Sequence, residues 1–90
     1  MNELIKVLLV RAVSDTELHV VFSNSMEGVR DYSDLLAEGG PMVEPLRDPA
    51  FFRRVFVSYG VPSWPNGFDV DAINLHDELH QSGRLRRAAA

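Results

Sequence analysis

The first quarter of the chain contains two segments with different patterns of hydrophobic and polar positions. In residues 17–23, Leu18, Val20 and Phe22 fall on one side, which is typical of a strand with one buried face. Residues 4–13 are apolar at both sets of alternate positions, which predicts a strand buried on both faces. A polar turn separates the two segments, so we expect them to form a hairpin.

The rest of the chain predicts short elements. They are a third strand at residues 29–32, a helical turn from Ser33, a helical turn after Asp48-Pro49, a strand at residues 54–59, a loop at residues 60–67 and a helix from an Asp71 cap to about Ser82. Ala72, Leu75 and Leu79 share one face of that last helix. This order predicts an α+β fold, a small antiparallel β-sheet meander with short helical turns and one C-terminal helix.

Composition narrows the class of protein. The chain has 90 residues, of which 46% are hydrophobic and 24% charged, so we expect a single folded domain over residues 1–83 and a flexible basic tail over residues 84–90. It has no cysteine, which excludes disulfides and thiolate chemistry and favours a reducing, cytoplasmic location. No apolar stretch reaches the ~18 residues of a spanning helix, so we expect no membrane partner.

The most distinctive segment is Trp64-Pro65-Asn66-Gly67-Phe68-Asp69. Pro65 fixes φ, and Asn66-Gly67 tolerates positive φ, so the segment predicts a tight turn with Trp64 as an apolar anchor. The turn is interpreted first as a rigid loop attached to the core. It is also the candidate recognition loop, in which Trp64, Pro65, Asn66, Gly67 and Asp69 contact a ligand or partner.

Several segments together carry a family resemblance. They are Gly28-Val29-Arg30-Asp31, Leu35-Leu36, Glu44-Pro45-Leu46, Asp48-Pro49 with Phe51 or Phe52, and Trp64-Pro65-Asn66-Gly67 with Asp69. The series resembles the bacterial family called domain of unknown function 2442. That resemblance implies a small α+β fold, also found fused ahead of helix-turn-helix domains, with no established activity. It also implies that members are often encoded beside another short protein, which suggests an antitoxin-like role in a two-protein pair.

Two histidines, His76 and His80, are spaced i and i+4 on the last predicted helix, as zinc ligands can be. Asp77 stands where a metalloprotease has its glutamate, and His19 lies on a distant strand. Catalytic zinc needs three protein ligands, so we expect no metal, no cofactor and a solvated helix face.

A basic cluster at the end of the chain is the weak candidate for nucleic-acid binding. Arg84, Arg86 and Arg87 could act there together with Arg53 and Arg54. The net charge of −4 disfavours a broad phosphate-binding surface, so we do not expect nucleic acid as the main partner.

These observations favour a non-catalytic binding or accessory module that acts on a protein partner, such as the antitoxin-like half of a two-protein pair. The alternatives are a component of a nucleic-acid-linked transcriptional regulator and, third, a small enzyme of unknown chemistry. One helix can cover only one face of the sheet, so we expect a homodimer or a heterodimer to cover Leu4, Leu8 and Val10. In the competing monomer, the helical turns around Leu35-Leu36 and Phe51-Phe52 close that second face.

Overall fold

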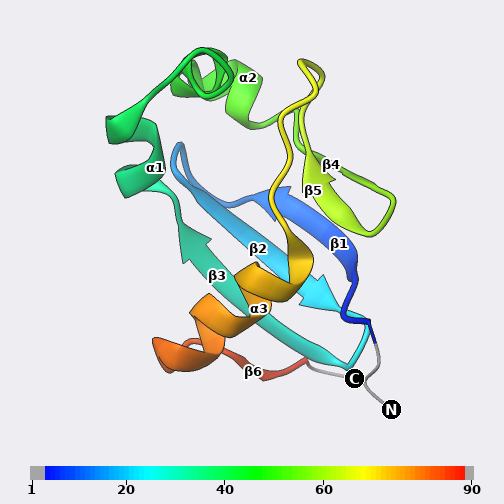
Figure 1. Ribbon diagram of the computed structural model, residues 1–90. Coiled ribbons are helices and arrows are strands. Elements are labelled where there is room, and N and C mark those ends of the chain that lie inside the picture. Colours follow the sequence, from blue (N-terminus) through cyan, green and yellow to red (C-terminus); the bar gives the residue numbers. More distant parts are fainter. Residues whose placement is uncertain (1–3, 89–90) are drawn as a thin grey trace.

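A computed structural model describes residues 4–88 of the chain. Its main sheet has four antiparallel strands in the order β1–β2–β3–β6, and a second sheet is the hairpin β4–β5 (Figure 1). The strands are β1 Val7–Ala12, β2 Glu17–Phe22, β3 Met26–Asp31, β4 Phe56–Ser58, β5 Val61–Ser63 and β6 Arg86–Arg87. The helices are α1 Ser33–Glu38, the 3-10 helix η1 Glu44–Arg47, α2 Pro49–Phe52 and α3 Ala72–Gln81. The α+β prediction is confirmed.

Strand β2 carries the centre of the core. Leu18, Val20 and Phe22 are fully buried on one face, as their alternation predicts. The following turn is tighter than the sequence indicates, because Ser25 adopts a φ of 69° and its N–H donates to the carbonyl oxygen of Phe22. Strand β3 therefore begins at Met26, three residues before the predicted start.

Strand β1 is not buried on both faces, so that prediction is wrong. Val7 pairs with Phe22 and Leu9 with Val21, so a β-bulge inserts one extra residue at Leu8. The bulge puts Val7 on the core side, 1% exposed, and leaves Leu8 and Leu9 at 57% and 64% exposed. The alternation resumes beyond it, and Val10 packs partly against the core.

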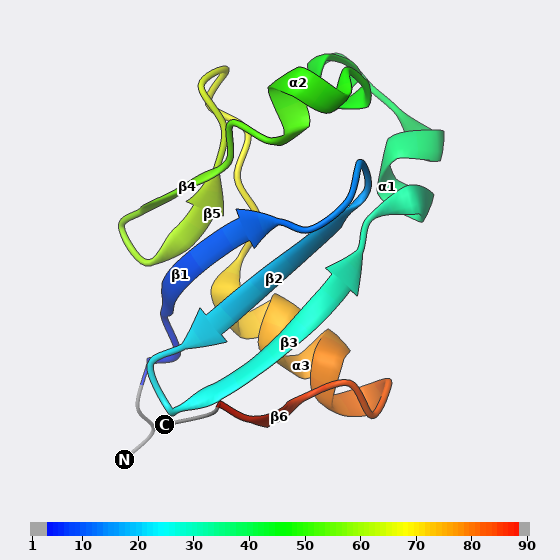
Figure 2. The same ribbon diagram turned by 180° about the vertical axis from the view of Figure 1, so that it is seen from behind.

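Helix α3 covers one face of the main sheet (Figures 1 and 2). The Asp71 side chain accepts a hydrogen bond from the N–H of Asn74 at 2.8 Å, which caps the helix as predicted. The buried side of the helix consists of Ala72, Leu75 and Leu79. The opposite face of the sheet is uncovered in Figure 2, where β1, β2 and β3 lie in front of α3.

The short helices lie at one end of the main sheet rather than over its second face (Figure 1). Leu36 of α1, Leu46 of η1 and Phe52 of α2 join the same core as the inner residues of β2. Asp48 caps α2 by accepting from the N–H of Ala50 at 3.1 Å, as the Asp-Pro pair predicts. These helices extend the core and leave the second face open.

The described part of the predicted tail, residues 84–88, differs from a free tail because it returns to the sheet. Arg86 and Arg87 pair with Glu27 and Met26 as strand β6, and the N–H of Ala88 donates to the carbonyl of Ser25 at 2.8 Å. The unpaired backbone groups at the edge of β3 provide the partners for this strand. Residues 89–90 lie outside the described residues. No helix within residues 4–88 is long and apolar enough to cross a membrane.

Candidate functional site

The Trp64 side chain belongs to the core. It is 1% exposed, and its Nε1–H donates to the carbonyl oxygen of Phe52 at 2.9 Å. The rings of Phe52 and Phe68 lie 5.9 and 5.7 Å away, centroid to centroid. A partner on the surface of this structure therefore meets the rest of the loop and not the indole.

The remainder of the candidate recognition loop is held by hydrogen bonds within its own turn and by one to Met42. The N–H of Gly67, at a φ of 91°, donates to the carbonyl of Trp64. The Asn66 side chain donates to the carbonyl of Met42 at 2.9 Å. Pro65, Gly67 and Asp69 are exposed, and a recognition role for them stays a prediction.

The histidines do not converge. The Nε2 of His76 lies 2.9 Å from the Asn24 amide nitrogen, which can only donate, so the lone pair that a metal would use accepts this hydrogen bond. The edge of the same ring faces Phe22, while His80 is exposed one turn later. His19 lies on β2 and is bonded to Glu27. No group of three or more potential metal ligands occurs in residues 4–88.

The arginines considered for nucleic-acid binding are separated. Arg53 and Arg54 follow α2, whereas Arg84, Arg86 and Arg87 lie at or beside β6, at the opposite end of the molecule (Figure 1). Arg53 is paired with Asp15 at 3.2 Å and Arg86 with Glu27 at 3.0 Å. The five side chains therefore form no single basic surface.

The uncovered face of the main sheet combines apolar and paired polar side chains. We call it the open face, and it consists of Leu8, Leu9, Arg11, Val13, Glu17, His19, Val21, Glu27, Val29, Asp31 and Arg86. A polar row crosses this face near the β2–β3 turn, where Glu27 accepts from His19 at 2.9 Å and from Arg86 at 3.0 Å. The hydrogen bond from His19, more than the charge of Arg86, lowers the pKa of Glu27. Leu9 stands opposite Val21 beside this row.

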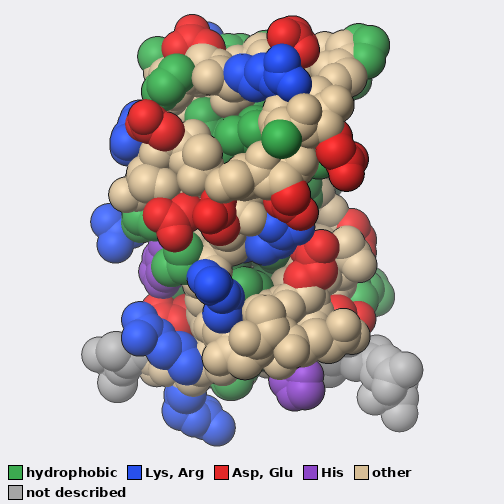
Figure 3. All heavy atoms as spheres, turned by 90° about the vertical axis from the view of Figure 1, so that its left-hand side faces the viewer, with side chains coloured by type: hydrophobic (Ala, Val, Ile, Leu, Met, Phe, Trp, Pro, Cys, Tyr) green, Lys and Arg blue, Asp and Glu red, His purple; other side chains and the backbone are tan. Residues whose placement is uncertain are grey.

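A cavity of about 200 Å³ lies on the other side of the sheet, between β3, α1, the 68–70 segment and α3. Its lining is Arg30, Tyr32, Asp34, Leu35, Glu38, Phe68, Val70, Asp71, Asn74, Leu75 and Glu78. In Figure 3, acidic side chains gather around a basic one near the middle of the molecule. The lining of the cavity contains no serine, threonine, cysteine, histidine or lysine.

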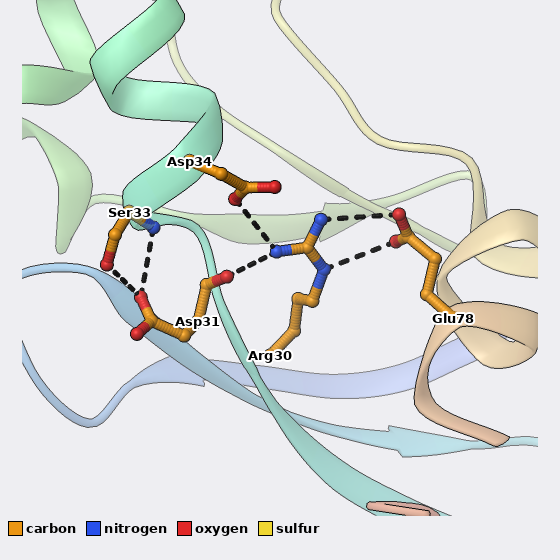
Figure 4. Close-up of polar contacts among 5 residues, drawn as sticks. All are labelled: Arg30, Asp31, Ser33, Asp34 and Glu78. Atoms are coloured by element: carbon orange, nitrogen blue, oxygen red, sulfur yellow. Dashed lines mark hydrogen bonds and ion pairs between the residues drawn. The ribbon is translucent and has the colours of Figure 1, made fainter. Parts of the chain in front are cut away.

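Arg30 organises the polar wall of this cavity (Figure 4). Its Nε and Nη2 donate to the two carboxylate oxygens of Glu78, at 3.3 and 3.2 Å. Its Nη1 donates to the Asp34 carboxylate at 3.1 Å and to the carbonyl of Asp31. The hydrogen bond from Arg30 is the main reason that the pKa of Asp34 is lowered. The guanidinium also lies over the Tyr32 ring, 4.5 Å from its centroid.

Residues 7–81 match the family model described as Protein of unknown function (DUF2442). The chain belongs to this family. No curated protein and no solved structure was found to match it significantly.

The DUF2442 match spans the strands β1 to β5, all the helices given above and the Trp64 loop, while β6 follows it. The family description assigns no activity, so the geometry has to identify the candidate residues. Sequence reasoning missed Arg30, Tyr32 and Glu78 as a group, because 48 residues separate Arg30 from Glu78. It also missed the His19–Glu27 pair, for which the only signal is that both side chains alternate with core residues of a hairpin.

Proposed function

We propose that this DUF2442 chain is a non-catalytic accessory module that binds a protein partner through its open face. The observation that carries the proposal is the exposure of Leu8 and Leu9 of β1 and of Val13 directly after it, at 57%, 64% and 42%, on a sheet face that no helix of residues 4–88 covers. Contiguous exposed apolar side chains with a polar surround are typical of protein interaction sites.

The energetic argument rests on β1 and its neighbour β2. Leu9 and Val21 stand opposite each other in neighbouring strands, and the bulge brings Leu8 to the same surface. Removing such side chains from water contributes about 25 cal/mol for each Å² of apolar surface buried. A domain of this size also gains from docking, because its own core shields only about 60–65% of the unfolded chain's surface.

A second copy of the chain is the first partner to test. The open face carries both signs of charge, with Arg11 and Arg86 against Glu17 and Asp31, so two copies need not oppose like charges. The family resemblance favours a neighbouring gene product as the second candidate, in an antitoxin-like pair. Either interface should bury more than about 1,000 Å² in total.

The test is sedimentation equilibrium of the full chain at micromolar concentration, alone and after co-expression with the neighbouring gene product. Leu9→Lys places a charge in the proposed interface. Tyr59→Lys is the matched control, because Tyr59 is fully exposed in the β4–β5 turn. We expect a dimer or a one-to-one complex that Leu9→Lys dissociates, while the control stays associated and both variants remain folded by circular dichroism. A monomer under both conditions contradicts the proposal.

A further inference from the structure

Strand β6 covers only the beginning of the outer edge of β3 (Figure 2). Within residues 4–88, the ladder between the two strands has two residue pairs and does not reach residues 28–31. Alternate residues of an antiparallel strand direct their backbone N–H and C=O groups to opposite neighbours, so Val29 directs these groups to the same side as Glu27. A groove bounded by residues 83–86 lies beside Val29. The edge therefore offers backbone partners beyond those that β6 uses.

Strand β6 itself buries little surface, because both of its side chains are exposed. Arg86 stays 74% exposed although it pairs with Glu27 at 3.0 Å, and ion pairs of exposed side chains contribute little to stability. One further backbone hydrogen bond runs from the N–H of Ala88 to the carbonyl of Ser25. The strand also lies beyond residues 7–81, which match the family. Short terminal elements of this kind open locally at a low free-energy cost, so another strand can take the place of β6.

The side chains along this edge favour a particular kind of strand. On the open face, the Glu27 carboxylate accepts a hydrogen bond from Arg86. Hydrogen bonds from the start of α1 are the main reason that the pKa of Asp31 is lowered, and the nearby charge of Arg84 adds to them. Leu85, between the two arginines, packs partly against the core. The edge therefore suits an extended segment in which an apolar residue stands between two arginines.

We propose that the outer edge of β3 docks an extended segment of a protein partner, with arginines on either side of an apolar residue, which adds as an antiparallel strand in place of residues 84–88. In such strand addition, main-chain hydrogen bonds supply affinity and the side chains supply specificity. The net charge of −4 favours the approach of a basic segment. An incoming arginine replaces Arg86 on Glu27, so the carboxylate stays paired. The site uses backbone groups of β3 and not the leucines of β1, so it does not depend on the partner proposed for the open face.

The test is a titration of the isotope-labelled full chain carrying Arg86→Pro, followed by amide chemical shifts in NMR spectra. The substitution removes both the guanidinium and the N–H that pair with Glu27, so it frees the edge. The probe is an end-blocked peptide with the sequence of residues 84–88, and the control peptide has glutamate at its third position. We expect saturable shifts centred on Glu27 and Val29, and binding at least about tenfold tighter than that of the control, the effect of a hydrogen bond to a charged group.

The unsubstituted chain provides an internal comparison. Its residues 84–88 compete with the peptide at an effective concentration on the order of millimolar, so we expect it to bind the peptide at least about tenfold more weakly than Arg86→Pro does. Circular dichroism establishes that the variant is folded. Arg86→Glu, which keeps the backbone N–H and repels Glu27, gives the same test if the proline variant does not fold. Absence of saturable shifts in a folded variant, or equal affinity for the two peptides, overturns the proposal.

Two double variants assign the charge contact. Glu27→Gln combined with Arg86→Pro should lose most of the preference for the basic peptide. Glu44→Gln combined with Arg86→Pro is the matched control and should keep it, because Glu44 lies in η1 and pairs with Arg47. An undiminished preference in the Glu27→Gln variant contradicts the assigned contact and with it the proposal. Leu9→Lys combined with Arg86→Pro should bind the peptide as Arg86→Pro does, so a failure at this edge and a failure at the open face are distinguishable.

Discussion

Trp64 should contribute more to stability than any other single side chain. It is the only tryptophan of the chain and is 1% exposed. It joins the 64–69 turn to α2 through a hydrogen bond and a ring contact with Phe52, and its ring also contacts Phe68 within the turn. Truncating a buried tryptophan to alanine costs about 3–5 kcal/mol. The Phe52 carbonyl also loses its donor, which adds about 1 kcal/mol. We expect Trp64→Ala to destabilise by about 4–6 kcal/mol in total, against a stability of about 5–14 kcal/mol for 90 residues.

The assay is urea denaturation followed by far-ultraviolet circular dichroism, because the variant has lost its fluorophore. Trp64→Phe keeps an aromatic ring but removes the donor, and it should lie between the parent and Trp64→Ala. Tyr59→Ala removes an exposed aromatic ring and should change stability by less than about 0.5 kcal/mol. A loss below about 1 kcal/mol in Trp64→Ala would refute the structural role and return Trp64 to the recognition loop.

Three further predictions concern positions away from Trp64. Tyr32→Phe removes a buried hydroxyl that has no partner in residues 4–88, so it should leave the free energy of unfolding unchanged or raise it by up to about 1 kcal/mol. A lower melting temperature of the variant would show that the hydroxyl is hydrogen-bonded in solution. Gly28→Ala should cost about 1–3 kcal/mol, because a Cβ there would lie 2.9 Å from the Arg84 carbonyl oxygen and 3.0 Å from Leu79 Cδ1; thermal unfolding measures this loss. The pKa values of Glu27, Asp31 and Asp34 are lowered in the folded state, so these carboxylates stabilise the fold at neutral pH, and this stabilisation is lost as the pH falls from about 5 through those values. Asp34→Asn should therefore make the free energy of unfolding less dependent on pH in that window.

Much of the fold is encoded locally and could be predicted. The alternation of Leu18, Val20 and Phe22 identifies a one-sided strand, and Asp48 and Asp71 are helix caps whose side chains bond the first-turn amides. These signals are local because each depends on residues a few positions apart.

The wrong or missing predictions concern features that depend on a single residue or on a contact between distant parts of the chain. The bulge at Leu8 cannot be read from a run of apolar residues, since every side chain in it suits either face. Strand β6 has only Arg86 and Arg87, without an apolar pattern, and exists because the edge of β3 offers backbone partners. The cavity depends on α3 bringing Glu78 to Arg30, a contact that no local pattern specifies.

The polar row across the open face affects which partner the proposed interface accepts. Glu27 is already paired on both sides, with His19 and Arg86, so docking need not leave its carboxylate without a partner. A partner can therefore present an apolar surface to Leu8 and Leu9 without supplying a charge to match Glu27. Arg86, whose side chain is 74% exposed, keeps a charge beside the exposed leucines when no partner is bound, and such a charge disfavours non-specific association. Removing the pairing with Glu27→Gln should therefore weaken specific association more than it weakens folding, and comparing its dissociation constant with its unfolding free energy separates the two effects.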